Sequence, residues 1–146
     1  MYNNKVILLT GAGGGIGAAI ANELSELGAK LILVGRHQEN LETVNQKLSG
    51  RHDVLVADIS SSAGRQTIKE HCEQRADGLD MLINNAGVSA FTRFESMSEE
   101  KIVSVININL TSTILLTQQL LPLLQTKPSS QIINIGSAFA SLAFTK

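Results

Sequence analysis

Residues 8–24 read LLTGAGGGIGAAIANEL and place five glycines within seven positions, between an apolar run and a helical pattern. The N-terminus of a helix carries unpaired N–H groups and about half a positive charge, so it attracts phosphate. A side chain in the loop would hold a phosphate at a distance, whereas glycine lets the backbone approach it. The stretch therefore predicts a phosphate-binding strand, loop and helix, with a tight turn that binds nothing as the alternative.

Short apolar runs rich in branched residues recur along the chain, with helical patterns between them. These runs are residues 6–9, 31–34, 54–57, 81–83 and 132–135. Runs of this kind are typical of parallel strands that are covered on both faces. The alternation predicts right-handed βαβ units, hence one α/β domain over residues 1–146 with helices on both faces of a parallel sheet.

The sequence predicts the buried face and the end of the first helix, and the start and end of a later, long helix. The first is expected to bury the face that carries Ile16, Ile20, Leu24 and Leu27 and to end at Gly28.

A capping-box spacing between Ser96 and Glu99 predicts the start of a long helix, and Pro122 and Pro128 bracket its expected end. Residues 102–126 hold no charged side chain, but their many polar groups argue against a membrane span.

The composition excludes several classes of protein. A net charge of −1 gives no electrostatic case for binding nucleic acid or an anionic membrane. The single Cys72 cannot form an internal disulfide, and the N-terminus shows no signal-peptide pattern, so a cytoplasmic location is expected. His37, His52 and His71 lack metal-ligand spacing, so they are interpreted as surface residues and no metal site is expected.

The glycine loop itself narrows the choice of ligand. A P-loop would need Gly-Lys-Ser/Thr, whereas Gly17 is followed by two alanines, which disfavours ATP or GTP hydrolysis. Residues 10–17 match the pattern TGxxxGIG. This match is better than the match of residues 13–18 to the looser dinucleotide-binding spacing. Further motifs follow in order: NNAG at 84–87, Asn109 within INL, and INIGS at 133–137. The chain therefore resembles the short-chain dehydrogenase/reductase family over essentially its whole length.

The resemblance implies a Rossmann-type sheet of order 3-2-1-4-5 and hydride transfer between a nicotinamide cofactor and a carbonyl or secondary alcohol. It implies catalytic roles for Ser137 and for Asn109, whose family counterpart supports a catalytic Lys through a bound water. The cofactor-binding residues would be Thr10, Gly11, Gly13, Gly14, Gly15, Ile16, Gly17, Arg36, Asp58, Ile59, Asn85, Ala86 and Gly87.

Several of these residues also have local interpretations that involve no ligand. Asp58 could be the N-cap of a helix that begins near Ser60, and Ser137 could be a turn residue. The amides of Asn84 and Asn85 could satisfy backbone groups of neighbouring elements.

The end of the second predicted strand bears on the choice between NADP and NAD. An NAD site usually places Asp or Glu there to bind the ribose hydroxyls, and that carboxylate repels a 2′-phosphate. This chain has Gly35 at that position and Arg36 next to it, and a guanidinium suits a phosphate. NADP(H) is therefore expected, with NAD(H) as the alternative.

The resemblance also implies a Tyr-x-x-x-Lys motif beyond Ser137. In these 146 residues no Tyr stands four positions before a Lys. The chain is therefore expected to be inactive by itself, and a non-catalytic nucleotide-binding or interaction module is the alternative function. An end at Lys146 is expected to leave residues 132–135 as an exposed apolar edge and to favour association. Homo-oligomers are expected to form through the long helix around residues 97–126.

Overall fold

Five parallel strands form one sheet in the order β3-β2-β1-β4-β5, as the sequence predicts. The computed structural model describes residues 2–50, 52–90 and 92–137. The strands are β1 (Val6–Thr10), β2 (Lys30–Gly35), β3 (Asp53–Val56), β4 (Met81–Asn84) and β5 (Gln131–Asn134). Each differs from its predicted apolar run by at most one residue at either end.

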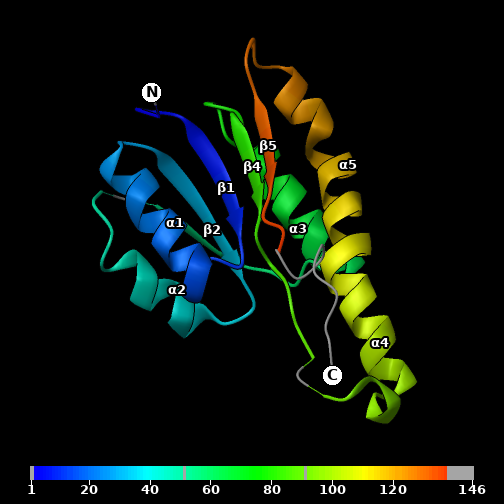
Figure 1. Ribbon diagram of the computed structural model, residues 1–146. Helices are drawn as coiled ribbons and strands as arrows, with labels where there is room; N and C mark the ends of the chain where they lie inside the picture. The colour runs from blue at the N-terminus through cyan, green and yellow to red at the C-terminus, as the bar shows by residue number, and fades with distance from the viewer. Residues whose placement is uncertain (1, 51, 91, 138–146) are drawn as a thin grey trace.

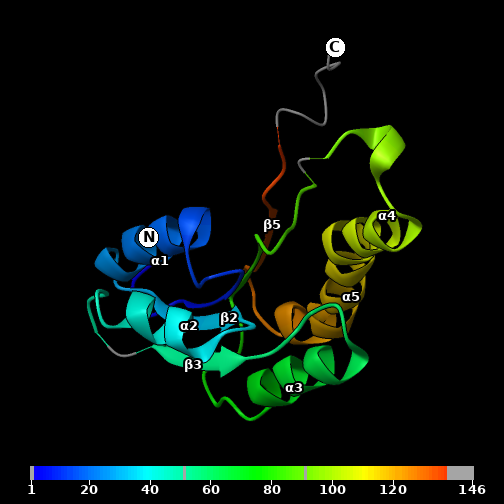
Figure 2. The ribbon, with the colours of Figure 1, turned by 90° about the horizontal axis from the view of Figure 1, so that it is seen from below.

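Helices cover both faces of this sheet, and Figures 1 and 2 show α1 and α2 on one face and α3 and α5 on the other. The first pair is α1 (Gly15–Glu26) and α2 (Gln38–Asn45). The second pair is α3 (Ser62–Glu73) and α5 (Ser112–Gln125). A further helix, α4 (Glu99–Ile106), lies in line with α5 and extends past the carboxyl ends of the strands (Figure 1).

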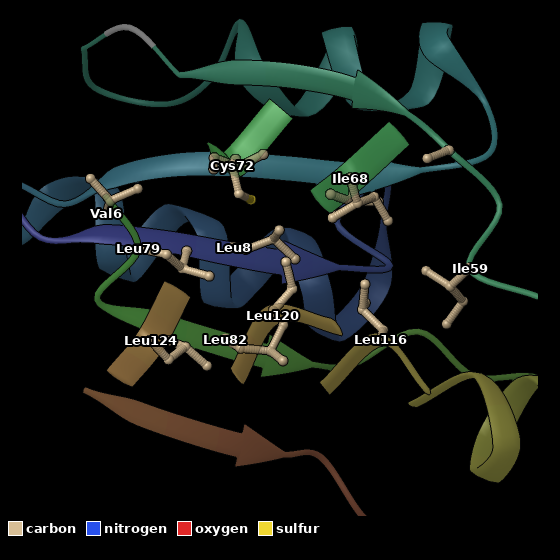
Figure 3. Packing of buried hydrophobic residues seen from close by; sticks show 13 residues of the cluster. Val6, Leu8, Ile59, Ile68, Cys72, Leu79, Leu82, Leu116, Leu120 and Leu124 are labelled. Carbon is tan, nitrogen blue, oxygen red and sulfur yellow. The ribbon is translucent and has the colours of Figure 1, made fainter. Parts of the chain in front are cut away.

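Each face of the sheet has its own hydrophobic cluster, because side chains alternate along a strand. From β1, Val6 and Leu8 face α3 and α5 and belong to one cluster with Ile68 and Leu120 (Figure 3). Cys72 belongs to the same cluster, and burial raises the pKa of its thiol to about 12. Cys72 therefore packs as a small apolar side chain on the buried face of α3.

The predicted buried face of α1 is correct at Leu24 and in part at Ile20, but wrong at Ile16 and Leu27. Ile16 is 64% exposed and Leu27 is 52% exposed, whereas α1 buries Gly17, Ala21 and Leu24. Gly17 faces inward because α1 lies very close to the glycine loop at this position, where a larger side chain would not fit.

The long helix starts two residues later than predicted, but it ends, as predicted, between Pro122 and Pro128. The N-cap of α4 is Ser98, whose hydroxyl accepts a hydrogen bond from Lys101 N–H, and not Ser96. A single π-helical stretch, η2 (Asn107–Thr111), joins α4 to α5. At the other end, Pro122 lies inside α5, which continues to Gln125. Among the described residues, no helix has both the length and the apolar character needed to cross a membrane.

Two apolar surfaces remain exposed on the described part of the chain. In and just after β5, Ile132, Ile133 and Ile135 are all exposed, so the expectation that every strand is covered on both faces is wrong for β5. The expected apolar edge at residues 132–135 is present. The second surface, which we call the α4–α5 stripe, consists of Val103, Ile106, Leu110, Ile114 and Leu121.

His52 is not a simple surface residue, because its ring is built into the amino end of β2. Its Nδ1 accepts a hydrogen bond from Leu31 N–H at 3.2 Å. Its Nε2 lies 3.0 Å from the carbonyl oxygen of Ser49. Since a carbonyl can only accept, the proton of the neutral ring belongs on Nε2. A second proton on Nδ1 would point at the donor of Leu31.

Stability is therefore expected to fall as the pH falls below about 6.5, the pKa of an unperturbed histidine. Burial outweighs the opposing effects of the Ser49 carbonyl and the Asp53 charge and lowers the pKa of His52. A lowered pKa means that the unfolded chain binds the proton more readily, so this contribution is full above pH 6.5 and is lost toward the folded-state pKa. Urea unfolding at pH 7.5 and pH 5.5 measures the loss, and His52→Asn should show a smaller difference between the two conditions. An equal difference in both proteins would contradict the assignment.

Candidate functional site

The glycine loop leaves the N-terminus of α1 open. The N-cap of α1 is Gly14, which has no side chain to accept hydrogen bonds from the first turn, and no acidic residue lies in that turn. A Cβ at Gly14 would have no atom within 4 Å, so the space above it is open. These unpaired N–H groups form the phosphate-attracting end that the sequence predicts.

Thr10 and Asn85 fasten the glycine loop to the segment that follows β4. The Thr10 hydroxyl accepts hydrogen bonds from the N–H groups of Asn85 and Ala86, both at 3.0 Å. In return, the Asn85 amide donates to the carbonyls of Thr10 (3.1 Å) and Gly11 (3.2 Å). The prediction that this amide satisfies backbone groups is confirmed for Asn85.

Asn84 has a different set of partners from the predicted one. Its amide nitrogen donates to the side chains of Thr117 (3.1 Å) and Asn134 (2.8 Å). Asn84 therefore connects β4 to α5 and β5 through side chains, and Ser137 follows three residues after β5.

A pocket of about 110 Å³ opens beside the glycine loop, at the carboxyl ends of the strands. Six of the predicted cofactor-binding residues line it: Gly11, Arg36, Asp58, Ile59, Ala86 and Gly87. The other lining residues were not predicted to bind the cofactor, although Gly35 was singled out at the end of the second strand. They are Val34, Gly35, Ala57, Val88 and Ile108. Most of these directly precede or follow a selected residue, which is the signal that could have identified them.

The remaining predicted residues lie around this pocket without lining it. Gly13 is close to α2, since a Cβ there would lie 3.2 Å from the Cβ of Asn40. Ile16 is mostly exposed at the start of α1. The loop and the start of α1 contain Gly14, Gly15 and Gly17. The contacts behind the loop are made by Thr10 and Asn85.

The side chain of Asp58 is an ionised carboxylate that lies just after the carboxyl end of β3. Its Oδ1 accepts hydrogen bonds from the N–H (2.9 Å) and the hydroxyl (2.7 Å) of Ser60. Burial favours the neutral acid, but these hydrogen bonds and the positive charge of Arg36 outweigh it and lower the pKa of Asp58. The N-cap of α3 is Ser61, so the alternative interpretation of Asp58 as that N-cap is wrong.

Asn109 lies in the π-helical stretch and binds the segment after β4. Its Oδ1 accepts from Val88 N–H and its Nδ2 donates to the Val88 carbonyl, both at 2.8 Å. The hydroxyl of Ser112 donates to the carbonyl of Asn107 at 2.7 Å and stabilises the same irregular turn. The side chain of Asn109 thus fixes Val88, a pocket-lining residue. Ser137 lies three residues after β5 and does not line the pocket.

Comparison with known proteins shows a consistent family likeness. The family model for the short chain dehydrogenase matches residues 5–145. An uncharacterized oxidoreductase of Staphylococcus aureus strain USA300 is 35% identical over 138 residues, which cover 94% of this chain and 60% of the relative. An uncharacterized oxidoreductase of Staphylococcus epidermidis strain ATCC 12228 is 32% identical over 133 residues, which cover 91% of this chain and 58% of the relative. The chain thus spans about 60% of the length of the curated relatives it matches.

Solved structures agree with this likeness. The Pseudomonas aeruginosa RhlG/NADP active-site complex matches with a TM-score of 0.91 and 33% identity, over 99% of this chain and 59% of the other. A metagenomic short-chain oxidoreductase in complex with NADP matches with a TM-score of 0.86 and 31% identity, over 93% of this chain and 63% of the other.

Proposed function

This chain belongs to the short-chain dehydrogenase family, and from that premise we propose that it binds NADP(H) and forms the dinucleotide-binding part of an oxidoreductase. The observation that carries the proposal is the pocket in which Gly35 and Arg36 stand beside Asp58, at the carboxyl ends of β2 and β3. Two similar solved proteins are complexes with NADP, which supports the same cofactor here.

The residues present suit the two charged parts of such a cofactor. The uncapped N-terminus of α1 and the open space above Gly14 fit a pyrophosphate that approaches the backbone. The exposed guanidinium of Arg36 fits a 2′-phosphate, and Gly35 places no carboxylate at the end of β2 to repel it. Asp58, with Ile59, would contact the adenine.

The chemistry follows the family. When bound, NADP(H) supplies or accepts the hydride in the interconversion of a carbonyl and a secondary alcohol. We assign Ser137 to the substrate oxygen and Asn109 to the support of the site, where its observed role is to hold Val88. Since no Tyr-x-x-x-Lys occurs in these 146 residues, we propose that they bind the nucleotide without catalysing the reaction by themselves.

We also propose that the chain associates with a second copy of itself and that it is located in the cytoplasm. The α4–α5 stripe fits association with a second copy, because its large apolar side chains are exposed along one continuous helical segment. The buried free thiol of Cys72 fits a reducing cytoplasm.

The cofactor proposal is tested by titrating the protein with NADPH and NADH in a calorimeter. NADPH is expected to bind more tightly, and Arg36→Ala should weaken NADPH binding by roughly tenfold or more while leaving NADH nearly unchanged, since a charge-assisted bond is lost. Arg93→Ala removes an exposed arginine outside the pocket and should change neither constant. The same samples, mixed with a carbonyl substrate, should show no oxidation of NADPH. NADH binding that is equal or tighter, and unaffected by Arg36→Ala, would overturn the choice of NADP.

A further inference from the structure

Arg65 is a charged residue at a position of α3 that faces the core. It shares its helical face with Ile68 and Cys72, at the spacing i, i+3, i+7, and all three are buried. Only 8% of Arg65 is exposed, and its Nε has no hydrogen-bond partner. Among residues 2–50, 52–90 and 92–137, no carboxylate lies within ion-pair distance of its guanidinium. A buried charge without a counterion destabilises a fold, so packing alone does not account for arginine here.

The guanidinium has one close contact that points toward the pocket. Nη1 of Arg65 donates a hydrogen bond to the carbonyl oxygen of Ile59 at 2.7 Å. Ile59 lines the pocket beside the glycine loop, and its side chain also belongs to the core cluster in Figure 3. Arg65 therefore fixes the backbone of a pocket-lining residue from behind, without touching the pocket itself.

Two further contacts hold the same turn, residues 58–60. Ser60 donates twice to the carboxylate of Asp58, as described above. Gly64 brings α3 so close to this turn that a Cβ at position 64 would lie 2.1 Å from the carbonyl oxygen of Asp58. The turn is thus fixed at the Asp58 side chain, at the Asp58 carbonyl and, through Arg65, at the Ile59 carbonyl.

We propose that Arg65 is a positioning residue for the adenosine half of the nucleotide, acting through the Ile59 carbonyl. The inference rests on the proposed function. The turn forms the wall of the pocket on the β2–β3 side, together with Arg36, whereas the glycine loop and Ala86 form the other wall. A change at Arg65 should therefore alter the adenosine side and leave the pyrophosphate side intact.

The test compares wild type with Arg65→Met and with a matched control, Lys69→Met, which removes the same charge from the same helix outside the pocket. The probes are 2′,5′-ADP, which carries the adenosine half, and inorganic pyrophosphate, which reports on the glycine loop. Arg65→Met is expected to weaken 2′,5′-ADP binding about five- to tenfold, with pyrophosphate binding unchanged. Its melting temperature should equal or exceed that of wild type, since an unpaired buried charge is replaced by an apolar chain.

Each other result has a definite meaning. Unchanged 2′,5′-ADP binding, or a parallel loss for both probes with a lower melting temperature, would overturn the role of Arg65 while leaving the proposed function in place. If Arg65→Met does not fold, Arg65→Gln decides in its stead on the same selective loss, and failure of both to fold would show a purely structural role. A wild-type chain that binds neither probe would overturn the proposed function, and this inference with it.

Discussion

Gly17→Ala is expected to abolish measurable NADPH binding and to lower the free energy of unfolding by about 2–3 kcal/mol, the range for a side chain forced into a filled space. A Cβ at this position would lie 2.1 Å from the carbonyl oxygen of Gly11 and 2.8 Å from Nδ2 of Asn85. Both atoms belong to the hydrogen bond that joins the loop to the segment after β4. The helix would have to move away from the loop, and the N–H groups that face the phosphate would move with it.

Gly14→Ala is the matched control, in the same loop and with the same added methyl group. No atom lies within 4 Å of the new Cβ, and the backbone at Gly14 is extended, with a φ of 165°. Urea unfolding of Gly14→Ala should therefore give a free energy near that of wild type. NADPH binding is expected to weaken, because the added methyl group enters the open space that fits the pyrophosphate. An equal loss of stability in both variants would show that the close approach at Gly17 is not the cause.

The parallel sheet was predictable because its strands are short apolar runs rich in branched residues, which are typical of parallel strands. The buried face of α1 was not, because the usual rule selects large apolar residues. At the start of α1 the requirement is a close approach to the loop, so Gly17 faces inward and Ile16 faces solvent. That requirement comes from the tertiary contact with Gly11 and leaves no periodic signal in the sequence.

In the site, too, residues that directly follow a strand were predictable, whereas residues placed by contacts distant in the sequence were not. Gly11, Arg36 and Asp58 were predictable because each directly follows a strand, and the carboxyl ends of parallel strands meet at one edge. Val88 and Ile108 stand next to the selected residues Gly87 and Asn109, but their place in the pocket was not predictable, because it depends on the hydrogen bonds between Asn109 and Val88. Those bonds depend on a π-helical turn, which has no recognised sequence pattern.

Thr10→Val is expected to lower the free energy of unfolding by about 2–4 kcal/mol, since each buried donor left without a partner costs about 1–3 kcal/mol. The side chains have nearly the same shape, but valine accepts no hydrogen bond. Thr10 is buried, and its hydroxyl is the acceptor for the N–H groups of both Asn85 and Ala86. NADPH binding should weaken as well, because Ala86 lines the pocket.

Thr10→Ser separates the hydrogen bonds from the packing. Serine keeps the hydroxyl and loses one methyl group, so it is expected to retain most of the stability and the NADPH affinity that Thr10→Val loses. Chemical denaturation and calorimetric titration of both variants measure the two effects. If Thr10→Ser proves as unstable as Thr10→Val, the methyl group and not the hydroxyl stabilises this position. In that case the connection between the glycine loop and the segment after β4 must depend on the two hydrogen bonds of the Asn85 amide alone.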